Sequence, residues 1–157
     1  MIPFLMESFI RLTPTRGFYA TMAVFFVCHS HFAHAACNSE INNAHKVSER
    51  IADEWPLRPS QDYETQHVRK IVDYLIPAIK LHMGSRNFNW PLKGIWEFLL
   101  IRDLSVNAYS IGNGKVYITD GTYNFVETEA ELAAIIIHEM AHQLMGHFCK
   151  NDNGRAT

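Results

Sequence analysis

Apolar positions after Ser60 recur at the three- and four-residue spacing of an amphipathic α-helix. The stripe consists of Val68, Ile71, Val72, Leu75, Ile76 and Ile79. Asp62 and Glu64 fall in the early turns of this helix, where carboxylates suit the positive end of the helix dipole. We therefore expect a helix that begins at Ser60 and packs its apolar stripe in the core. A shorter helix is expected over residues 39–51, ending before two prolines.

The pattern changes after Trp96 from helical spacing to short runs of strand-forming residues. The first run, residues 97–103, is rich in strand-forming residues, and two more runs follow at 106–111 and 115–119. The last two runs are separated by Gly-Asn-Gly at 112–114, residue types that adopt the positive φ angles of tight hairpin turns. The sequence predicts a small antiparallel sheet that contains this hairpin.

A long final helix is predicted after the hairpin. Thr128 and Glu131 have the spacing of a capping box, in which each side chain bonds the backbone N–H of the other residue. We expect this helix to run to about Phe148. The predicted order of elements is therefore two helices, a small sheet and a final helix.

The composition limits the class of protein. The chain has 157 residues, of which 48% are hydrophobic and 12% aromatic, and this is enough apolar material for one domain with a core. Its formal net charge is -2. Nucleic-acid binding draws on a surplus of Lys and Arg that neutralises phosphates, so this charge balance argues against a nucleic-acid partner.

Residues 1–35 have the pattern of a secretory signal peptide. An apolar block at 18–28 follows two arginines and lies in a stretch without charged residues, and a small-x-small pattern ends at Ala35. We expect cleavage after Ala35, export to the periplasm or cell envelope, and a single domain over residues 36–157.

Two other interpretations of this leader stay open. A membrane anchor would need about 20 consecutive apolar residues, and the block at 18–28 is shorter and is followed by histidines. A lipoprotein signal ending at Cys37 is the second alternative, but His34 occupies the position that such signals give to Leu. The sequence favours a cleaved signal peptide over both.

Export determines which cysteines the mature domain keeps and whether they can form a disulfide. If Cys28 leaves with the signal peptide, the mature domain keeps Cys37 and Cys149. Disulfides persist in exported proteins, so a bridge between these two residues is allowed. Two separate thiols are an equally weighted alternative.

The final helix carries the candidate chemistry. His138 and His142 are four residues apart and therefore lie on one helical face, so each ring can direct a nitrogen at one Zn²⁺ ion. Glu139 lies about 100° round the helix from His138, beside the ion, where a carboxylate can take a proton from water. This pattern predicts a zinc hydrolase with two histidine ligands and a glutamate base.

Two stretches of the chain resemble the HtpX-like zinc metallopeptidases, a family that also contains the type 1 CAAX prenyl proteases and exported bacterial quality-control proteases. The resemblance covers roughly residues 96–148. It rests on the pair Asn107 and Ala108, on the hairpin, and on an H-E-x-A-H helix followed by Gly146 and His147.

The resemblance implies a zincin-like α+β domain and a function. By resemblance, His138 and His142 are zinc ligands, Glu139 is the catalytic base, and the strand at 115–119 is the edge along which an extended polypeptide docks. The implied activity is that of a zinc metalloendopeptidase of the cell envelope that hydrolyses misfolded or membrane-associated proteins. Membrane association and oligomeric state stay open.

The resemblance also implies a third ligand, a Glu on a later helix. Residues 150–157 contain no Glu, and Asp152 is the carboxylate in that stretch. His147 lies about 180° round an ideal helix from His138, so we interpret it as a packing or supporting residue and not as a ligand. The ligand set is therefore expected to be incomplete, as in a fragment. A truncated, non-catalytic remnant that binds zinc weakly or binds unfolded polypeptide is the alternative function.

Overall fold

The computed structural model describes residues 37–84, 90 and 94–149. The predicted signal peptide, most of the loop predicted between Gly84 and Gly94, and Asp152 lie outside the described residues, so the structure does not test those predictions.

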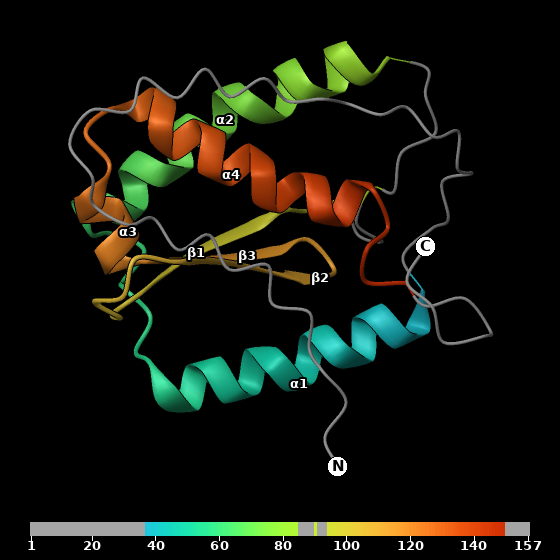
Figure 1. Cartoon of the computed structure of the whole chain (residues 1–157), viewed down its shortest axis with the longest axis horizontal. Helices are drawn as coiled ribbons and strands as arrows, with labels where there is room; N and C mark the ends of the chain where they lie inside the picture. The colour runs from blue at the N-terminus through green and yellow to red at the C-terminus, as the bar shows by residue number, and fades with distance from the viewer. Residues whose placement is uncertain (1–36, 85–89, 91–93, 150–157) are drawn as a thin grey trace.

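Three layers make up the described part of the chain (Figure 1). Helix α1 (Asn38–Glu54) covers one face of a small sheet, and helices α2 (Tyr63–Met83) and α4 (Glu129–Leu144) cover the other. A short helix, α3 (Asp120–Phe125), lies at one end of the sheet. The α+β fold class is confirmed.

The sheet has three strands, β1 (Glu97–Ile101), β2 (Ala108–Gly112) and β3 (Lys115–Thr119), in the order β1-β3-β2. β2 and β3 are antiparallel, whereas β1 and β3 are parallel. The prediction of an antiparallel sheet is therefore wrong for β1. β3 lies between the other two strands, and it is buried along nearly its whole length.

The connection from β1 to β2 explains the parallel pair. Its backbone passes the end of β3, where Thr119 N–H donates to the Asn107 carbonyl at 3.2 Å and Gly121 N–H donates to the Asp103 carbonyl at 2.9 Å. These bonds hold the connection across the end of β3, so that β2 pairs on the far side of β3 from β1.

The predicted hairpin is confirmed. Gly112, Asn113 and Gly114 have φ angles of 90°, 50° and 78°, which suit these residue types in a tight turn. A Cβ atom at Gly112 would lie 2.7 Å from Cγ of Glu40, so the approach of α1 to this turn also requires glycine.

Two hydrophobic clusters lie on the two faces of the sheet. The larger is formed with α2 and α4, and its buried members are Val68, Ile71, Val72, Leu100, Val116, Ile118, Leu132, Ile136, Met140 and Leu144. The smaller is formed with α1, from Ala44, Ile51, Ile101, Ile111 and Tyr117. Alternate residues of β3 thus enter opposite clusters, as strand geometry requires. The prediction that the α2 stripe packs in the core is confirmed.

The start of α2 differs from the prediction. The helix begins at Tyr63, with Asp62 as its N-cap residue, and not at Ser60. Arg58 explains the shift, because its guanidinium binds Asp62 at 3.3 Å and Asp120 at 2.6 Å. These ion pairs hold residues 58–62 against α3 in a non-helical conformation.

The last helix begins as predicted and ends earlier. The capping box between Thr128 and Glu131 is present. The helix ends at Leu144 and not at Phe148, because Gly146 has a φ of 73°, which leaves the helical region. Helix α3 was not predicted from the sequence; its first turn is capped by the Thr119 side chain, which accepts from Thr122 N–H.

Candidate metal centre

Helix α4 brings two imidazole rings together. Nε2 of His138 and Nε2 of His142 lie 3.2 Å apart, and the rings meet edge to face with centroids 4.8 Å apart. Both residues are half-buried. The predicted pairing on one helical face is therefore what the structure shows, and the two nitrogens converge on one point where an ion could bind.

Glu139 lies beside this pair and is buried, with 2% of its surface exposed. One carboxylate oxygen and one nitrogen of each histidine all lie within 4.8 Å of one another. Burial raises the pKa of Glu139 to about 7, although a hydrogen bond from the backbone N–H of Ser110 favours the charged form. The carboxylate is thus close to both histidines and able to exchange a proton near neutral pH.

The protonation state of His142 suits metal binding. Burial, together with the neighbouring rings of His138 and His147, lowers its pKa to about 4. The ring is therefore neutral at pH 7 and keeps a lone pair for a metal ion. Two imidazoles beside a carboxylate fit Zn²⁺. Within the described residues, this group consists of His138, Glu139 and His142.

His147 lies on the other side of His142. Its Nδ1 is 2.8 Å from Nδ1 of His142, and its backbone N–H donates to the His142 carbonyl at 3.0 Å. The turn at Gly146 returns the chain so that this contact forms. His147 therefore supports the ring of His142 at the nitrogen remote from His138.

Gln143 joins the site to the sheet, a role that was not predicted from the sequence. Its side chain is buried, accepts from Gly114 N–H at 2.6 Å, and donates to the Ser110 hydroxyl at 2.8 Å and the Lys115 carbonyl at 2.9 Å. These three bonds fix α4 against the β2–β3 hairpin. The sequence signal for this role was a side-chain amide directly after His142, the second histidine of the motif.

His67 positions the beginning of α4, and it was also missed. Its Nδ1 lies 2.7 Å from the Tyr123 hydroxyl and its Nε2 lies 2.8 Å from a carboxylate oxygen of Glu129. The hydrogen bond with His67 lowers the pKa of Glu129. One side chain of α2 thus contacts both α3 and the first turn of α4.

The predicted docking edge is wrong. β3 is the central strand and has a neighbour on each side. Within the described residues, β2 is paired on one side only, and Ser110 of β2 is the residue whose N–H contacts Glu139. The strand edge beside the metal centre belongs to β2.

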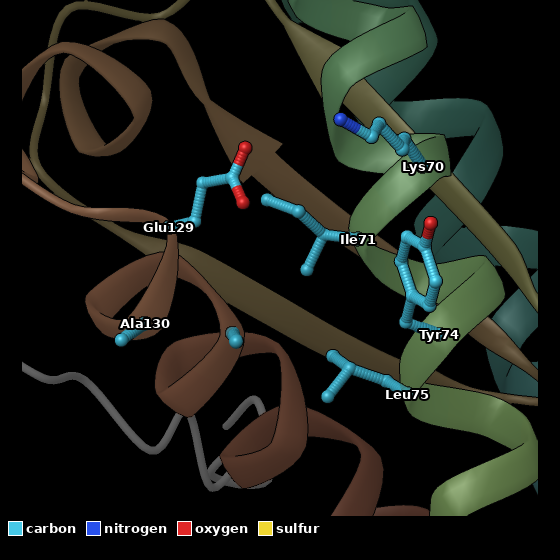
Figure 2. A pocket seen from close by; sticks show the side chains of 7 residues that line it. Lys70, Ile71, Tyr74, Leu75, Glu129 and Ala130 are labelled. Atoms are coloured by element: carbon cyan, nitrogen blue, oxygen red, sulfur yellow. The ribbon is translucent and has the colours of Figure 1, made fainter.

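An open pocket of about 240 Å³ lies between α2 and α4 but does not contain the candidate site. Figure 2 shows Ile71 and Leu75 of α2 facing the first turns of α4, with Lys70 and Glu129 nearby. His138 and His142 are not among its lining residues.

No helix in the described ranges is long and apolar enough to cross a membrane.

A helix that carries H-E-x-x-H, packed on a small sheet with its histidines converging, defines a metallopeptidase-type site. Comparison with known families agrees, because the model of peptidase family M48 matches residues 62–154. The chain belongs to peptidase family M48.

Curated relatives match over short stretches. The mitochondrial metalloendopeptidase OMA1 of Schizosaccharomyces pombe is 40% identical over 52 residues, which is 33% of this chain and 15% of that protein. The protein of the same name from Arabidopsis thaliana is 37% identical over 57 residues, 36% of this chain and 12% of that protein. A putative beta-barrel assembly-enhancing protease of Vibrio cholerae is 32% identical over 60 residues, 38% of this chain and 12% of that protein.

Proposed function

We propose that this chain carries the catalytic centre of a zinc-dependent metalloendopeptidase with a zincin-like arrangement. His138 and His142 would hold Zn²⁺, and Glu139 would act as the general base. The observation that carries the proposal is the convergence of the two Nε2 atoms at 3.2 Å beside a buried carboxylate, in a member of a peptidase family. When bound, Zn²⁺ supplies Lewis-acid activation of water and of the substrate carbonyl.

Glu139 performs the proton transfers. Its carboxylate takes a proton from the attacking water and returns it to the nitrogen of the leaving amine. A base is most effective when its pKa is close to the working pH, and burial raises the pKa of Glu139 to about 7. His142 stays neutral because its pKa is lowered to about 4, so it remains a ligand at the pH of catalysis.

The substrate would be an extended polypeptide that pairs with β2. This strand is the sheet edge beside Glu139, and an added strand gains main-chain hydrogen bonds along such an edge. The Ser110 N–H that now bonds Glu139 would then become available to the substrate backbone. Docking on β2 replaces the docking on residues 115–119 that the family resemblance implied.

Export and the substrate class are part of the proposal. The signal-like pattern of residues 1–35 supports export to the periplasm or cell envelope, with a mature domain over 36–157. The Vibrio cholerae relative, by its name a putative beta-barrel assembly-enhancing protease, agrees with an envelope location. Misfolded or membrane-associated proteins are the proposed substrates.

A second candidate function is zinc binding or polypeptide binding without hydrolysis. Catalytic zinc sites have three protein ligands and one open position. Among the described residues, the group at this site has two histidines and the base, and Glu139 is engaged with the Ser110 N–H. The source of a third ligand decides between the two functions.

The test compares wild type with Glu139→Gln. Wild type loaded with zinc is expected to cleave an unfolded substrate such as casein, and a chelator should stop it. Glu139→Gln should reduce the rate by about 10²-fold or more while zinc stays bound, because an amide cannot accept the proton. Glu127→Gln, the same change at an exposed residue before α4, is the matched control.

Three results would contradict this assignment. Cleavage by Glu139→Gln at the wild-type rate would show that the activity has another source. The control His82→Ala should retain zinc after dialysis. Equal retention by the double variant His138→Ala/His142→Ala would place the metal elsewhere. Zinc bound by wild type without any hydrolysis would favour the non-catalytic function.

A further inference from the structure

A second cluster of reactive side chains lies where the start of α1 meets the segment after α4. It consists of Cys37, Glu40 and Cys149, whose two Sγ atoms and one carboxylate oxygen lie within 4.8 Å of one another. Cys37 N–H donates to Cys149 Sγ at 3.2 Å, although the two residues are 112 positions apart. The fold thus brings together the two cysteines of the predicted mature chain. Both side chains are thiols in the structure.

Glu40 is the buried centre of this cluster, with 4% of its surface exposed. One carboxylate oxygen accepts from Asn113 N–H at 2.8 Å and the other accepts from the Cys149 thiol at 3.3 Å. A buried carboxylate requires such donors, and these two satisfy it without a cation. A metal ion held by the same three residues would have to displace the Cys149 proton and its bond to Glu40.

The two thiols are not equivalent. Burial, together with the side-chain contacts of Cys149 with Cys37 and Glu40, raises the pKa of Cys149 to about 12. Cys37 is half-buried; burial would raise its pKa, but hydrogen bonds with Cys149, with Ser39 and with the Glu40 backbone outweigh it and lower the pKa. Cys37 is therefore the accessible, more acidic thiol, and Cys149 is the protected one.

We propose that Cys37 and Cys149 form a disulfide in the mature protein, which joins the start of α1 to the turn that follows α4. The proposal rests on the export proposed above, because disulfides persist in oxidising compartments. It does not depend on zinc binding or on hydrolysis.

The oxidant is a disulfide, either of a dithiol oxidoreductase or of oxidised glutathione. The Cys37 thiolate attacks one sulfur of that disulfide, forms a mixed disulfide and releases the first thiolate. Cys149 gives its proton to Glu40, and its thiolate attacks Cys37 Sγ and expels the second thiolate. Two electrons pass to the oxidant, one S–S bond breaks, and one S–S bond forms.

The bridge would restrain the part of the chain that supports the metal centre. Cys149 N–H donates to the Gly146 carbonyl at 3.1 Å, and His147 lies within this turn against His142. A covalent link at Cys149 therefore holds the turn that carries His147 to α1.

The test uses the purified full chain, equilibrated with oxidised or with reduced glutathione, alkylated with iodoacetamide and digested. After oxidation, we expect a peptide pair linked through Cys37 and Cys149 and no alkylation of either residue. After reduction, both residues should be alkylated, Cys37 first. The oxidised protein should melt on the order of 10 °C higher, because the bridge closes a long loop of the unfolded chain.

Substitutions supply the controls. Cys37→Ser and Cys149→Ser should each abolish the difference in Tm between oxidised and reduced protein, whereas Cys28→Ser should keep it. Linkage mapping of wild type stays decisive even if a variant folds poorly. The double variant His138→Ala/His142→Ala should form the same Cys37–Cys149 linkage as wild type. This result separates the disulfide proposal from the proposed function.

Four outcomes would overturn the proposal. The first is full alkylation of Cys37 and Cys149 after oxidation. The second is a bridge from either residue to Cys28. The third is protection of the thiols that a chelator removes, which would mark the cluster as a metal site. The fourth is a lipid adduct on Cys37 of protein recovered from cells.

Discussion

Nδ1 of His142 and Nδ1 of His147 lie 2.8 Å apart, while Nε2 of His142 faces His138 at 3.2 Å. A hydrogen bond between two Nδ1 atoms requires a proton on one of them, and a proton on Nδ1 of His142 leaves its Nε2 as the lone-pair nitrogen. When that proton is on His142, the contact with His147 holds the ring in the tautomer that a metal ligand needs.

Replacement of His147 is expected to weaken zinc binding. His147→Ala should raise the Kd for Zn²⁺ by about 10-fold or more, the usual effect of losing a group that orients a ligand. His147→Gln, which keeps a hydrogen-bonding group near Nδ1, should recover part of the affinity. Competition with a chromophoric chelator measures this, and His82→Ala is the control at an exposed position. Equal affinity in His147→Ala and wild type would contradict the supporting role.

Glu139 makes the metal-free protein less stable as the pH rises. Its pKa is raised from 4.5 to about 7 by burial, so the folded state binds this proton more tightly than the unfolded state. The contribution is fully present below about pH 4.5 and is lost as the pH rises through about 7. A shift of this size corresponds to about 3 kcal/mol of unfolding free energy.

His142 acts in the opposite sense. Its pKa is lowered from 6.5 to about 4, chiefly by burial, so its contribution is present above about pH 6.5 and is lost as the pH falls through about 4. The two effects oppose one another between about pH 4.5 and 6.5, and wild type should change little there. Glu139→Gln, which keeps only the His142 effect, should lose stability as the pH falls from about 6.5 to about 4. Urea unfolding of chelator-treated protein measures the unfolding free energy of wild type and of Glu139→Gln across this pH range. Parallel pH profiles for the two proteins would contradict this account.

Gln143 is expected to stabilise the contact between α4 and the hairpin. Gln143→Leu leaves Gly114 N–H without its buried acceptor and the Lys115 carbonyl without its donor, which should cost about 2–3 kcal/mol of unfolding free energy. Urea unfolding at pH 7 is the measurement. Gln66→Leu, which removes one exposed side-chain bond to the Ser60 carbonyl, should change stability by less than about 0.5 kcal/mol. A similar small loss for both variants would show that the buried bonds contribute little.

Local chemistry was sufficient for several features. The capping box of Thr128 and Glu131 was predictable because its partners are three residues apart, and the hairpin at 112–114 because only certain residue types adopt its φ angles. The pairing of His138 with His142 follows from the helical repeat itself. In each case the interacting residues are close in sequence, so no long loop has to close before the contact forms.

The tertiary structure decided the features that join distant segments. The central place of β3, the contact of Glu139 with Ser110 and the meeting of Cys37 with Cys149 each depend on how the layers stack. The residue types in a strand show which side chains point to each face of the sheet, but they do not show which strand is its neighbour. The alternation with a period of two is the same whichever strand pairs with it. Burial of both faces of β3, together with the bonds that hold the 102–107 connection across its end, selected one strand order among several that the sequence pattern allowed.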